Sequence, residues 1–248
     1  MKLSKSICIM TYNVHSCIGR DGRISPFRIA NIIAQYEPDI VALQELDVGR
    51  VRTGHIHQAK MIADHLNMDF HFHPSIEIRE EQYGNAILSR YPLRMVQAGS
   101  LPTLKGRTLE TRGALWTSID VEGQAVHVVN THLGLNGRER ATQAEALLSS
   151  EWLEHPSCCS PFFICGDFNA LPLSTVYRRF KAKLQDVQHG NGNRPRNTYP
   201  SFYPIFRIDH IFTSPEVVVH SVEVPRTSLT RIASDHLPLI ARVSIREP

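Results

Sequence analysis

The sequence contains no apolar stretch that approaches the length needed to cross a membrane. A transmembrane helix requires about 20 consecutive apolar residues. Residues 1–6 are followed by only four apolar residues, which is too few for the core of a secretory signal peptide. We therefore expect neither a membrane span nor a signal peptide, and we expect the chain to be cytoplasmic.

Cysteine is scarce, and its spacing indicates no metal site. The five cysteines are Cys8, Cys17, Cys158, Cys159 and Cys165. They lack the paired spacing of a zinc site, and their odd number argues against a disulfide framework. Cys8 and Cys165 lie in apolar stretches that are typical of strands. We interpret the cysteines as reduced thiols of a cytoplasmic protein.

Positive charge is limited to a net +3, so the sequence predicts no broad cationic surface. Binding to duplex nucleic acid depends mainly on neutralising phosphates, and this composition weighs against it without excluding a local basic groove. Internal repeats and low-complexity linkers are also lacking. With 248 residues, 42% hydrophobic and 21% charged, the chain is typical of one globular domain, which we expect to span residues 1–248.

Polar residues stand at the end of an apolar segment that is typical of a buried strand. Phe162–Cys165 is apolar, and Gly166–Asn169 follows directly. Side chains two residues apart lie on the same side of an extended backbone, so Asp167 and Asn169 are expected side by side. A strand end is rigid but open, and polar groups there can face a substrate. The alternative is an ordinary turn, in which Gly, Asp and Asn are common.

Four further polar clusters end or begin apolar segments, and they weigh against the turn interpretation. They are Thr11–His15, Gln44–Glu45, Asn130–Leu133, and a split cluster made of Arg207–Phe212 and Ser234–His236. Carboxylates are rarely left at buried strand ends unless they are paired or bind a cation. The five clusters together predict one polar site assembled from the ends of strands.

In this order, the clusters resemble those of the endonuclease/exonuclease/phosphatase superfamily, which includes deoxyribonuclease I, AP endonucleases, neutral sphingomyelinases and inositol phosphatases. The resemblance runs from Asn13 to His236. With Tyr83–Arg90 in the middle, it is closest to a bacterial subgroup of uncharacterised hydrolases. It implies an α/β fold, a four-layered sandwich of two packed mixed β-sheets flanked by helices, with the site at one end between the sheets.

The resemblance also implies a Mg²⁺-dependent phosphoester hydrolase, with phosphodiesters favoured, that uses an activated water. Mn²⁺ is expected to substitute for Mg²⁺. The implied metal ligands are Glu45, Asn13 and Asp235. A hard cation of this kind is held by few carboxylates and keeps several waters.

The same resemblance assigns the catalytic residues. Asp167 positions or deprotonates the attacking water, and Asn169 donates a hydrogen bond to a phosphoryl oxygen. Asp209 and His236 match the family's carboxylate–imidazole pair, in which the carboxylate raises the imidazole pKa so that a cation contacts the phosphate. His132 matches a phosphate ligand or leaving-group acid.

Several residues near these motifs keep two interpretations. His132 is also compatible with a hydrogen-bonded core histidine, and Glu81 either orients His132 or is a solvated loop residue. Arg112 begins a strand and is expected to bind phosphate bidentately. Asn85 supports the site or faces the phosphate of the substrate, and the alternative is a turn residue after Gly84. His15 departs from the AP endonuclease pattern at a position where it would alter metal coordination or contact substrate.

Substrate choice is expected to depend on a basic and aromatic loop that follows Gly190. Its candidate substrate-binding residues are Arg194, Arg196, Tyr199, Phe202 and Tyr203. Such residues bind single-stranded bases by stacking, lie at a lipid interface or grip a phosphorylated ring, unless they pack onto the domain. Nucleic acid and peripheral membrane contact therefore stay open as partners of a chain that we expect to be monomeric. Gly19–Arg23 and Gly49–Gly54 are further candidates for phosphate-binding charge.

Two alternative functions stay open beside the hydrolase of a phospholipid, small phosphodiester or nucleic acid. One is a DNA or RNA endonuclease or exonuclease proper. The other is a non-catalytic binding module of the same fold, which the complete set of motif residues disfavours.

Hydrophobic periodicity predicts where the helices and strands lie. Ser25-Pro26 begins a helix that Pro38 ends. Further helices are predicted at 57–66 and 138–153, and strands at 7–14, 40–44, 85–89, 113–121, 124–131, 162–165, 217–224 and 239–245.

Overall fold

The computed structural model describes residues 5–104, 110–189 and 195–245, and these residues form two six-stranded sheets. The first sheet has the spatial order β11 (Val217–Glu223), β12 (Leu239–Ile245), β1 (Lys5–Asn13), β2 (Ile40–Val48), β4 (Glu81–Ser89) and β3 (Asp69–Ile78). The second has the order β5 (Leu93–Ser100), β6 (Gly113–Val121), β7 (Gln124–His132), β8 (Phe162–Asp167), β10 (Asp209–Thr213) and β9 (Gln185–Asp186). Both sheets are mixed, because β1 pairs in parallel with β2, and β7 with β8, among antiparallel neighbours.

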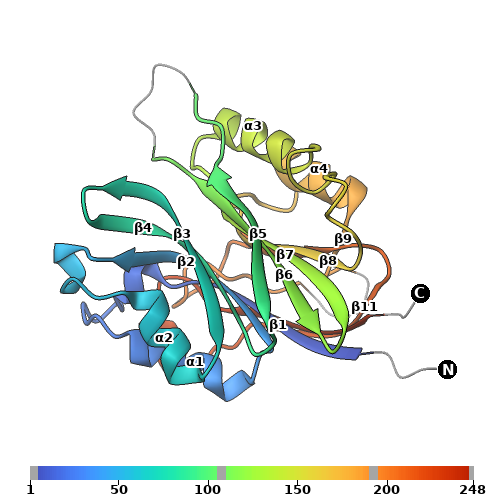
Figure 1. The fold of residues 1–248 in the computed structure, drawn as a ribbon. Helices are drawn as coiled ribbons and strands as arrows, with labels where there is room; N and C mark the ends of the chain where they lie inside the picture. Colours follow the sequence, from blue (N-terminus) through green and yellow to red (C-terminus); the bar gives the residue numbers. More distant parts are fainter. Residues whose placement is uncertain (1–4, 105–109, 190–194, 246–248) are drawn as a thin grey trace.

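Helices cover the outer faces of the two sheets (Figure 1). The first sheet carries α1 (Pro26–Tyr36), α2 (Gln58–Leu66) and α5 (Ser228–Ala233), and the second carries α3 (Gly137–Leu147) and α4 (Thr175–Lys183). The predicted four-layered sandwich is therefore confirmed.

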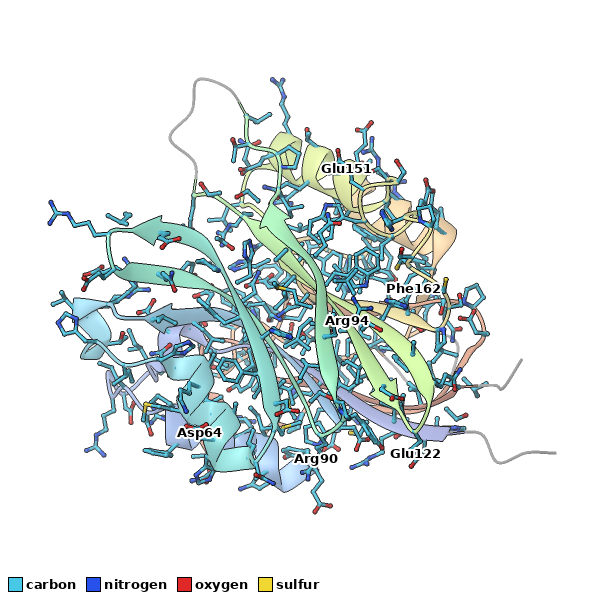
Figure 2. The ribbon with its side chains drawn as sticks, in the orientation of Figure 1. Asp64, Arg90, Arg94, Glu122, Glu151 and Phe162 are labelled. Atoms are coloured by element: carbon cyan, nitrogen blue, oxygen red, sulfur yellow. The ribbon has the colours of Figure 1, made fainter. Side chains whose placement is uncertain are left out.

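Three apolar cores hold the four layers together. In β1, Ile9 points into the core between the sheets, and Met10 points into the core beneath α1 and α2. This alternation follows from the two-residue period of a strand and explains why β1 reads as a continuous apolar run. Figure 2 shows side chains filling the interior, while the charged Asp64, Glu122 and Glu151 lie at the periphery.

The helix predicted at 138–153 is shorter than expected, and the prediction was wrong for its last turn. Helix α3 ends at Leu147, where the Ser149 hydroxyl donates to the carbonyl of Ala146 (2.7 Å). The chain then turns back, and Trp152 and Leu153 enter the core against α3. A local hydroxyl–carbonyl bond of this kind competes with continuation of a helix.

The strand ends that carry the polar clusters lie away from the chain termini. Strand β1 begins, and β12 ends, at the side of the molecule where Figure 1 marks the termini. Asn13 is the last residue of β1 and therefore lies at the opposite end of the sandwich. Among the described residues, no helix is long and apolar enough to cross a membrane.

Candidate active site

Five strands meet near one open cavity of about 530 Å³ at this end of the sandwich: β1, β7 and β8 end there, β10 begins there, and β2 passes it. Among the polar residues of these strands are Asn13 in β1, Glu45 in β2, His132 in β7, Asp167 in β8 and Asp209 in β10. The cavity lining comprises His15, Ser16, Ile18, Glu45, Arg50, Arg52, Tyr83, Glu110, Arg112, His132, Leu135, Asp167, Asn169, Tyr199, Ile208, Asp235 and His236. The structure thus brings together groups that lie more than 200 residues apart in the sequence.

A β-bulge places Glu45 at the cavity. The pairing of β2 with β4 shifts register between Leu43 and Leu46, and Glu45 has a positive φ of 62°. Bulges of this kind re-aim a side chain at the edge of a sheet. Because of the bulge, β2 continues past the predicted end at Gln44 and runs to Val48.

Gly166 allows β8 to approach β7 closely. Its φ is +143°, and a Cβ atom at this position would lie 1.8 Å from the carbonyl oxygen of Thr131. Only glycine fits such a close backbone approach. The two residues that follow Thr131 and Gly166, His132 and Asp167, are therefore held side by side.

A buried amide pair joins the two sheets directly beneath the site. Gln44 Nε2 donates to Asn130 Oδ1 (2.8 Å), and Asn130 Nδ2 donates to the carbonyls of Leu43 and Ala86 (2.8 Å each). Both side chains are fully buried, where an unpaired amide would be costly. This pair fixes the position of Glu45 in one sheet relative to the end of β7 in the other.

Asn13 links two carboxylates at the centre of the site. Its Nδ2 donates to Glu45 Oε1 (2.9 Å) and to Asp167 Oδ2 (3.1 Å). Its Oδ1 accepts from the backbone N–H of His15 (3.1 Å). Asn13 therefore holds Glu45 and Asp167, from different sheets, at one point.

The Asp209–His236 pair is buried and faces Asp167. His236 Nδ1 lies 2.8 Å from Asp209 Oδ2, and His236 Nε2 lies 3.6 Å from Asp167 Oδ2. Burial alone would lower the pKa of His236, but the carboxylates of Asp209 and Asp167 outweigh it and raise that pKa to about 10. The ring of Tyr199 packs on the imidazole, with the ring centres 4.8 Å apart. His236 is therefore a cation at neutral pH.

His132 approaches the same carboxylate in a different environment. Its Nε2 lies 3.4 Å from Asp167 Oδ2 and 3.2 Å from Asn169 Nδ2, while Arg112 Nη1 donates to its Nδ1 (3.0 Å). Burial, then the charges of Arg112 and His236, hold the pKa of His132 well below its usual range. His132 is therefore neutral, and because Nδ1 accepts, its proton lies on Nε2.

Burial raises the pKa of Asp167 to about 7, and the charge of His236 opposes this increase. Asp167 is 2% exposed. Its Oδ1 accepts from the backbone N–H of Asn169 (2.9 Å), whose positive φ of 48° closes the turn after β8. A carboxylate with a pKa near neutrality can both accept and release a proton at physiological pH.

Three other predicted residues occupy distinct positions. Asp235 lines the cavity next to His236, and its Oδ1 accepts from Ser234 Oγ (3.4 Å). Asn85 is buried and absent from the cavity lining, and its Nδ2 donates to the carbonyl of Gly113 (3.2 Å). Glu81 does not orient His132, since its carboxylate lies beside Arg50 (3.5 Å).

The predicted substrate loop reaches the cavity at one residue. Tyr199 lines the cavity, whereas Arg196, Phe202 and Tyr203 are exposed outside it. The guanidinium of Arg20 lies over the Phe202 ring at 4.2 Å. Arg194 lies outside the described residues.

Sequence analysis missed Asp47, which fixes the cationic wall of the cavity. Asp47 is fully buried, and Arg52 donates to both its carboxylate oxygens (2.7 and 2.8 Å). Arg50 lies 3.7 Å from the same carboxylate, and both guanidiniums lie beside the Tyr83 ring. The arginines of the polar loop Gly49–Gly54 could be recognised in the sequence as candidate phosphate-binding residues. Asp47 could not, because apolar residues flank it.

The donors at the site suit a hard divalent cation. The carboxylates of Glu45 and Asp235 line the cavity, and ligand atoms of Asp167 and Asp209 lie within 4.8 Å of each other. Asp209 Oδ1 is buried with no hydrogen-bond partner among the described residues. No cysteine lines the cavity in the part of the chain that the structure describes, and oxygen donors of this kind favour Mg²⁺ or Mn²⁺ over soft metals.

Two packed mixed sheets with a carboxylate and histidine site at one end define the class of deoxyribonuclease I-like hydrolases. The chain belongs to the endonuclease/exonuclease/phosphatase family, whose model matches residues 10–236. The resemblance seen in the sequence is thereby confirmed. Members of this family hydrolyse phosphate esters.

Individual relatives share the whole length of the chain. The uncharacterized protein YbhP of Escherichia coli K12 is 28% identical over 252 residues, which cover 97% of each chain. A family member from Bacteroides thetaiotaomicron superposes with a TM-score of 0.79 at 20% identity, over 99% of this chain and all of the other. The mannosyl-6-phosphatase Bt3783 of the same organism gives a TM-score of 0.78 at 21% identity, over 96% and 99% of the two chains. At these identities the structural matches support the fold.

Proposed function

We propose that this chain is a Mg²⁺-dependent phosphoester hydrolase, with phosphodiesters favoured, and that the cavity at the strand ends is its active site. The observation that supports this most is the convergence of Asp167 with two imidazoles of different charge. His236 Nε2 and His132 Nε2 lie 3.6 and 3.4 Å from the same oxygen, Asp167 Oδ2. A carboxylate, a cation and a neutral donor are the groups that hydrolysis of an anionic ester requires.

Glu45, Asp235 and Asn13 are the residues that we propose to hold the metal. When bound, a divalent cation would neutralise phosphate charge and polarise a phosphoryl oxygen. Asn13 already fixes the Glu45 carboxylate, and Asp235 lines the same cavity. The chain's own contribution is to hold these oxygen donors in fixed positions.

Asp167 is proposed as the base. Its pKa of about 7 lets it accept a proton from water near neutral pH, and its bond from the Asn169 N–H fixes its orientation. A base with a pKa near the working pH contributes a factor of roughly 10² to 10⁴ in rate. The adjacent imidazolium of His236 stabilises the ionised form of Asp167 until substrate arrives.

The remaining groups are proposed to bind the phosphoryl oxygens. His236 supplies a positive charge, and the Nε2 proton of His132 supplies a neutral donor near the same oxygen of Asp167. Asn169 lies beside His132, with its Nδ2 donating to the carbonyl of Leu133 (2.9 Å). Donors that are fixed before substrate binds need little reorganisation during the reaction. Arg112 is proposed to orient His132 as well as to face the phosphate.

The test of this function is metal-dependent hydrolysis of bis-p-nitrophenyl phosphate. We expect activity with Mg²⁺ or Mn²⁺ and none in EDTA. Glu45→Gln should reduce activity by roughly 100-fold or more, because it removes a charge from the cation site with little change of shape. Glu81→Gln is the matched control, since Glu81 is outside the cavity lining, and it should stay near wild type.

Full activity in chelator would overturn the proposed metal dependence. A Glu45→Gln variant as active as Glu81→Gln would remove Glu45 from the mechanism. If no phosphoester is turned over under any metal condition by a folded chain, the binding-module alternative stands. A parallel panel of plasmid DNA, RNA, lysophospholipids and inositol phosphates then separates the substrate classes.

A further inference from the structure

Two loops close to the cavity expose large apolar side chains. One follows β8 and the other precedes β10. Their exposed fractions range from 41% for Phe206 to 88% for Leu173. The set, which we call the apolar rim, consists of Leu171, Leu173, Phe202, Tyr203, Ile205 and Phe206. Exposed apolar groups that gather in one place, in contrast to scattered ones, mark an interaction surface.

Four of the six residues of the apolar rim line one groove. Leu171 and Leu173 from the first loop line an open groove of about 590 Å³ together with Ile205 and Phe206 from the second. The second loop is a hairpin, because Phe206 N donates to the carbonyl of Tyr199 (2.8 Å) and Tyr199 N donates back to the carbonyl of Phe206 (3.0 Å). Phe202 and Tyr203 lie at the tip of this hairpin.

The groove beside the apolar rim is cationic. Lys181, His189 and Arg207 contribute to its lining, and no acidic residue does so among the described residues. Arg207 is buried and pairs with Asp186, so the accessible cation of the groove is Lys181. An apolar surface flanked by positive charge complements a partner that is apolar inside and anionic at its face.

The apolar rim adjoins the catalytic cavity on both loops. Leu171 follows the cavity residue Asn169 by two positions. Tyr199 and Ile208, which enclose the hairpin in sequence, also line the catalytic cavity. Leu135, 75% exposed, adds an apolar side chain to the lining of that cavity. A partner bound to the apolar rim would therefore lie next to the proposed site of hydrolysis.

We propose that the apolar rim binds peripherally to a lipid surface with anionic headgroups and so presents the catalytic cavity to that surface. Side chains on narrow loop tips can enter the boundary between headgroups and acyl chains without a partner of matching shape, and the neighbouring Lys181 then contacts the headgroups. Lipid binding is a property separate from the proposed hydrolysis. It is measured without turnover, so an experiment can contradict one of the two proposals and leave the other intact.

The experiment is co-sedimentation of the full chain with vesicles, in EDTA so that no hydrolysis occurs. Vesicles of phosphatidylcholine mixed with phosphatidylglycerol should bind the chain more tightly than vesicles of phosphatidylcholine alone. Added salt should reduce this extra binding to the anionic vesicles and leave binding to phosphatidylcholine unchanged. Leu173→Ser with Ile205→Ser should reduce partitioning by roughly tenfold for each side chain removed. Lys181→Gln should reduce it about fivefold on the anionic vesicles alone.

Phe27→Ser with Met95→Ser is the control, because these apolar side chains are also exposed (51% and 46%) but lie on α1 and β5. It should bind vesicles like wild type. Circular dichroism and hydrolysis of a soluble diester verify that both double variants are folded. The proposal is overturned if the chain binds neither kind of vesicle, or if the two double variants bind the anionic vesicles equally well. Binding of single-stranded oligonucleotides through the apolar rim in place of vesicles, or a dimer that only Leu173→Ser with Ile205→Ser dissociates, would also overturn it.

Discussion

The site contains two histidines, His132 and His236, whose Nε2 atoms lie near the same oxygen atom. The groups next to their other ring nitrogens carry opposite charges. His132 and His236 are each 5% exposed, and both direct Nε2 toward Asp167 Oδ2. On the far nitrogen, Nδ1, His132 meets the Arg112 guanidinium at 3.0 Å and His236 meets the Asp209 carboxylate at 2.8 Å. Their exposure is equal, so the partner of Nδ1 is the main difference between the two histidines: Asp209 outweighs the effect of burial on His236, and Arg112 adds to it on His132.

The difference teaches how one residue type serves two roles in one cavity. Beside a carboxylate, buried imidazole gains a proton and its pKa rises to about 10. Beside a guanidinium, it stays neutral and keeps one proton, on Nε2. The site thus holds a cation and a neutral donor near the same oxygen of the proposed base, without needing a lysine at its centre.

The largest expected effect comes from replacing each histidine with glutamine. His236→Gln removes the only charge of this pair and should reduce kcat by roughly 10² to 10³. His132→Gln keeps a neutral amide that can still donate, and should lose about tenfold. The measurement is steady-state hydrolysis of bis-p-nitrophenyl phosphate with saturating Mg²⁺. Equal losses of kcat in the two variants would contradict the different roles of His236 and His132.

Asp209→Asn sharpens the comparison through the pH profile. Activity should rise as Asp167 ionises near its pKa of about 7, and it should decline as the pH rises through the pKa of about 10 of cationic His236. Removing the negative charge of Asp209 lowers that pKa, so the decline should move down by about 1 to 3 pH units. Asp64→Asn, at an exposed carboxylate on α2, is the control and should leave the profile unchanged. An unshifted profile in Asp209→Asn would contradict the pairing.

Arg112→Gln is expected to have the smallest effect on the titrations. Burial is the largest cause of the low pKa of His132, and the Arg112 charge comes second. Removing that charge should therefore raise the pKa of His132, while burial still holds it below its usual range. NMR titration of the imidazole protons measures this shift. No change, or a fall, would show that the Arg112 charge does not lower the pKa of His132.

Much of the site was predictable because its signals are local. Asp167 and Asn169 follow an apolar strand, and Asn13 and Glu45 follow two others, so each polar group is marked by the segment before it. Parallel strands then bring such ends to one edge of a sheet. The layers of the fold were predicted from the family resemblance that these clusters carry.

The features that the sequence did not predict depend on contacts between segments that are distant in the chain. Arg112 was expected to bind phosphate. In the structure its Nη1 donates to Nδ1 of His132, and the sequence gives no sign of that contact. The strand β3 was not predicted, because its half-buried residues alternate histidines with phenylalanines at a sheet edge and include Pro74. Helix α4 is rich in charge and is anchored by few residues, among them Tyr177 and Phe180. Packing overrides weak local preference in such segments.

The most direct test of opposite charges at one carboxylate is a ¹H–¹⁵N spectrum of the imidazoles in the wild-type chain. It is recorded at a pH of about 8, between the pKa values of Asp167 and His236. Substitution of each histidine in turn assigns the signals. We expect His236 to carry protons on both ring nitrogens, and His132 to carry one proton, on Nε2. Two neutral rings, two cationic rings, or a His132 proton on Nδ1 would contradict the account.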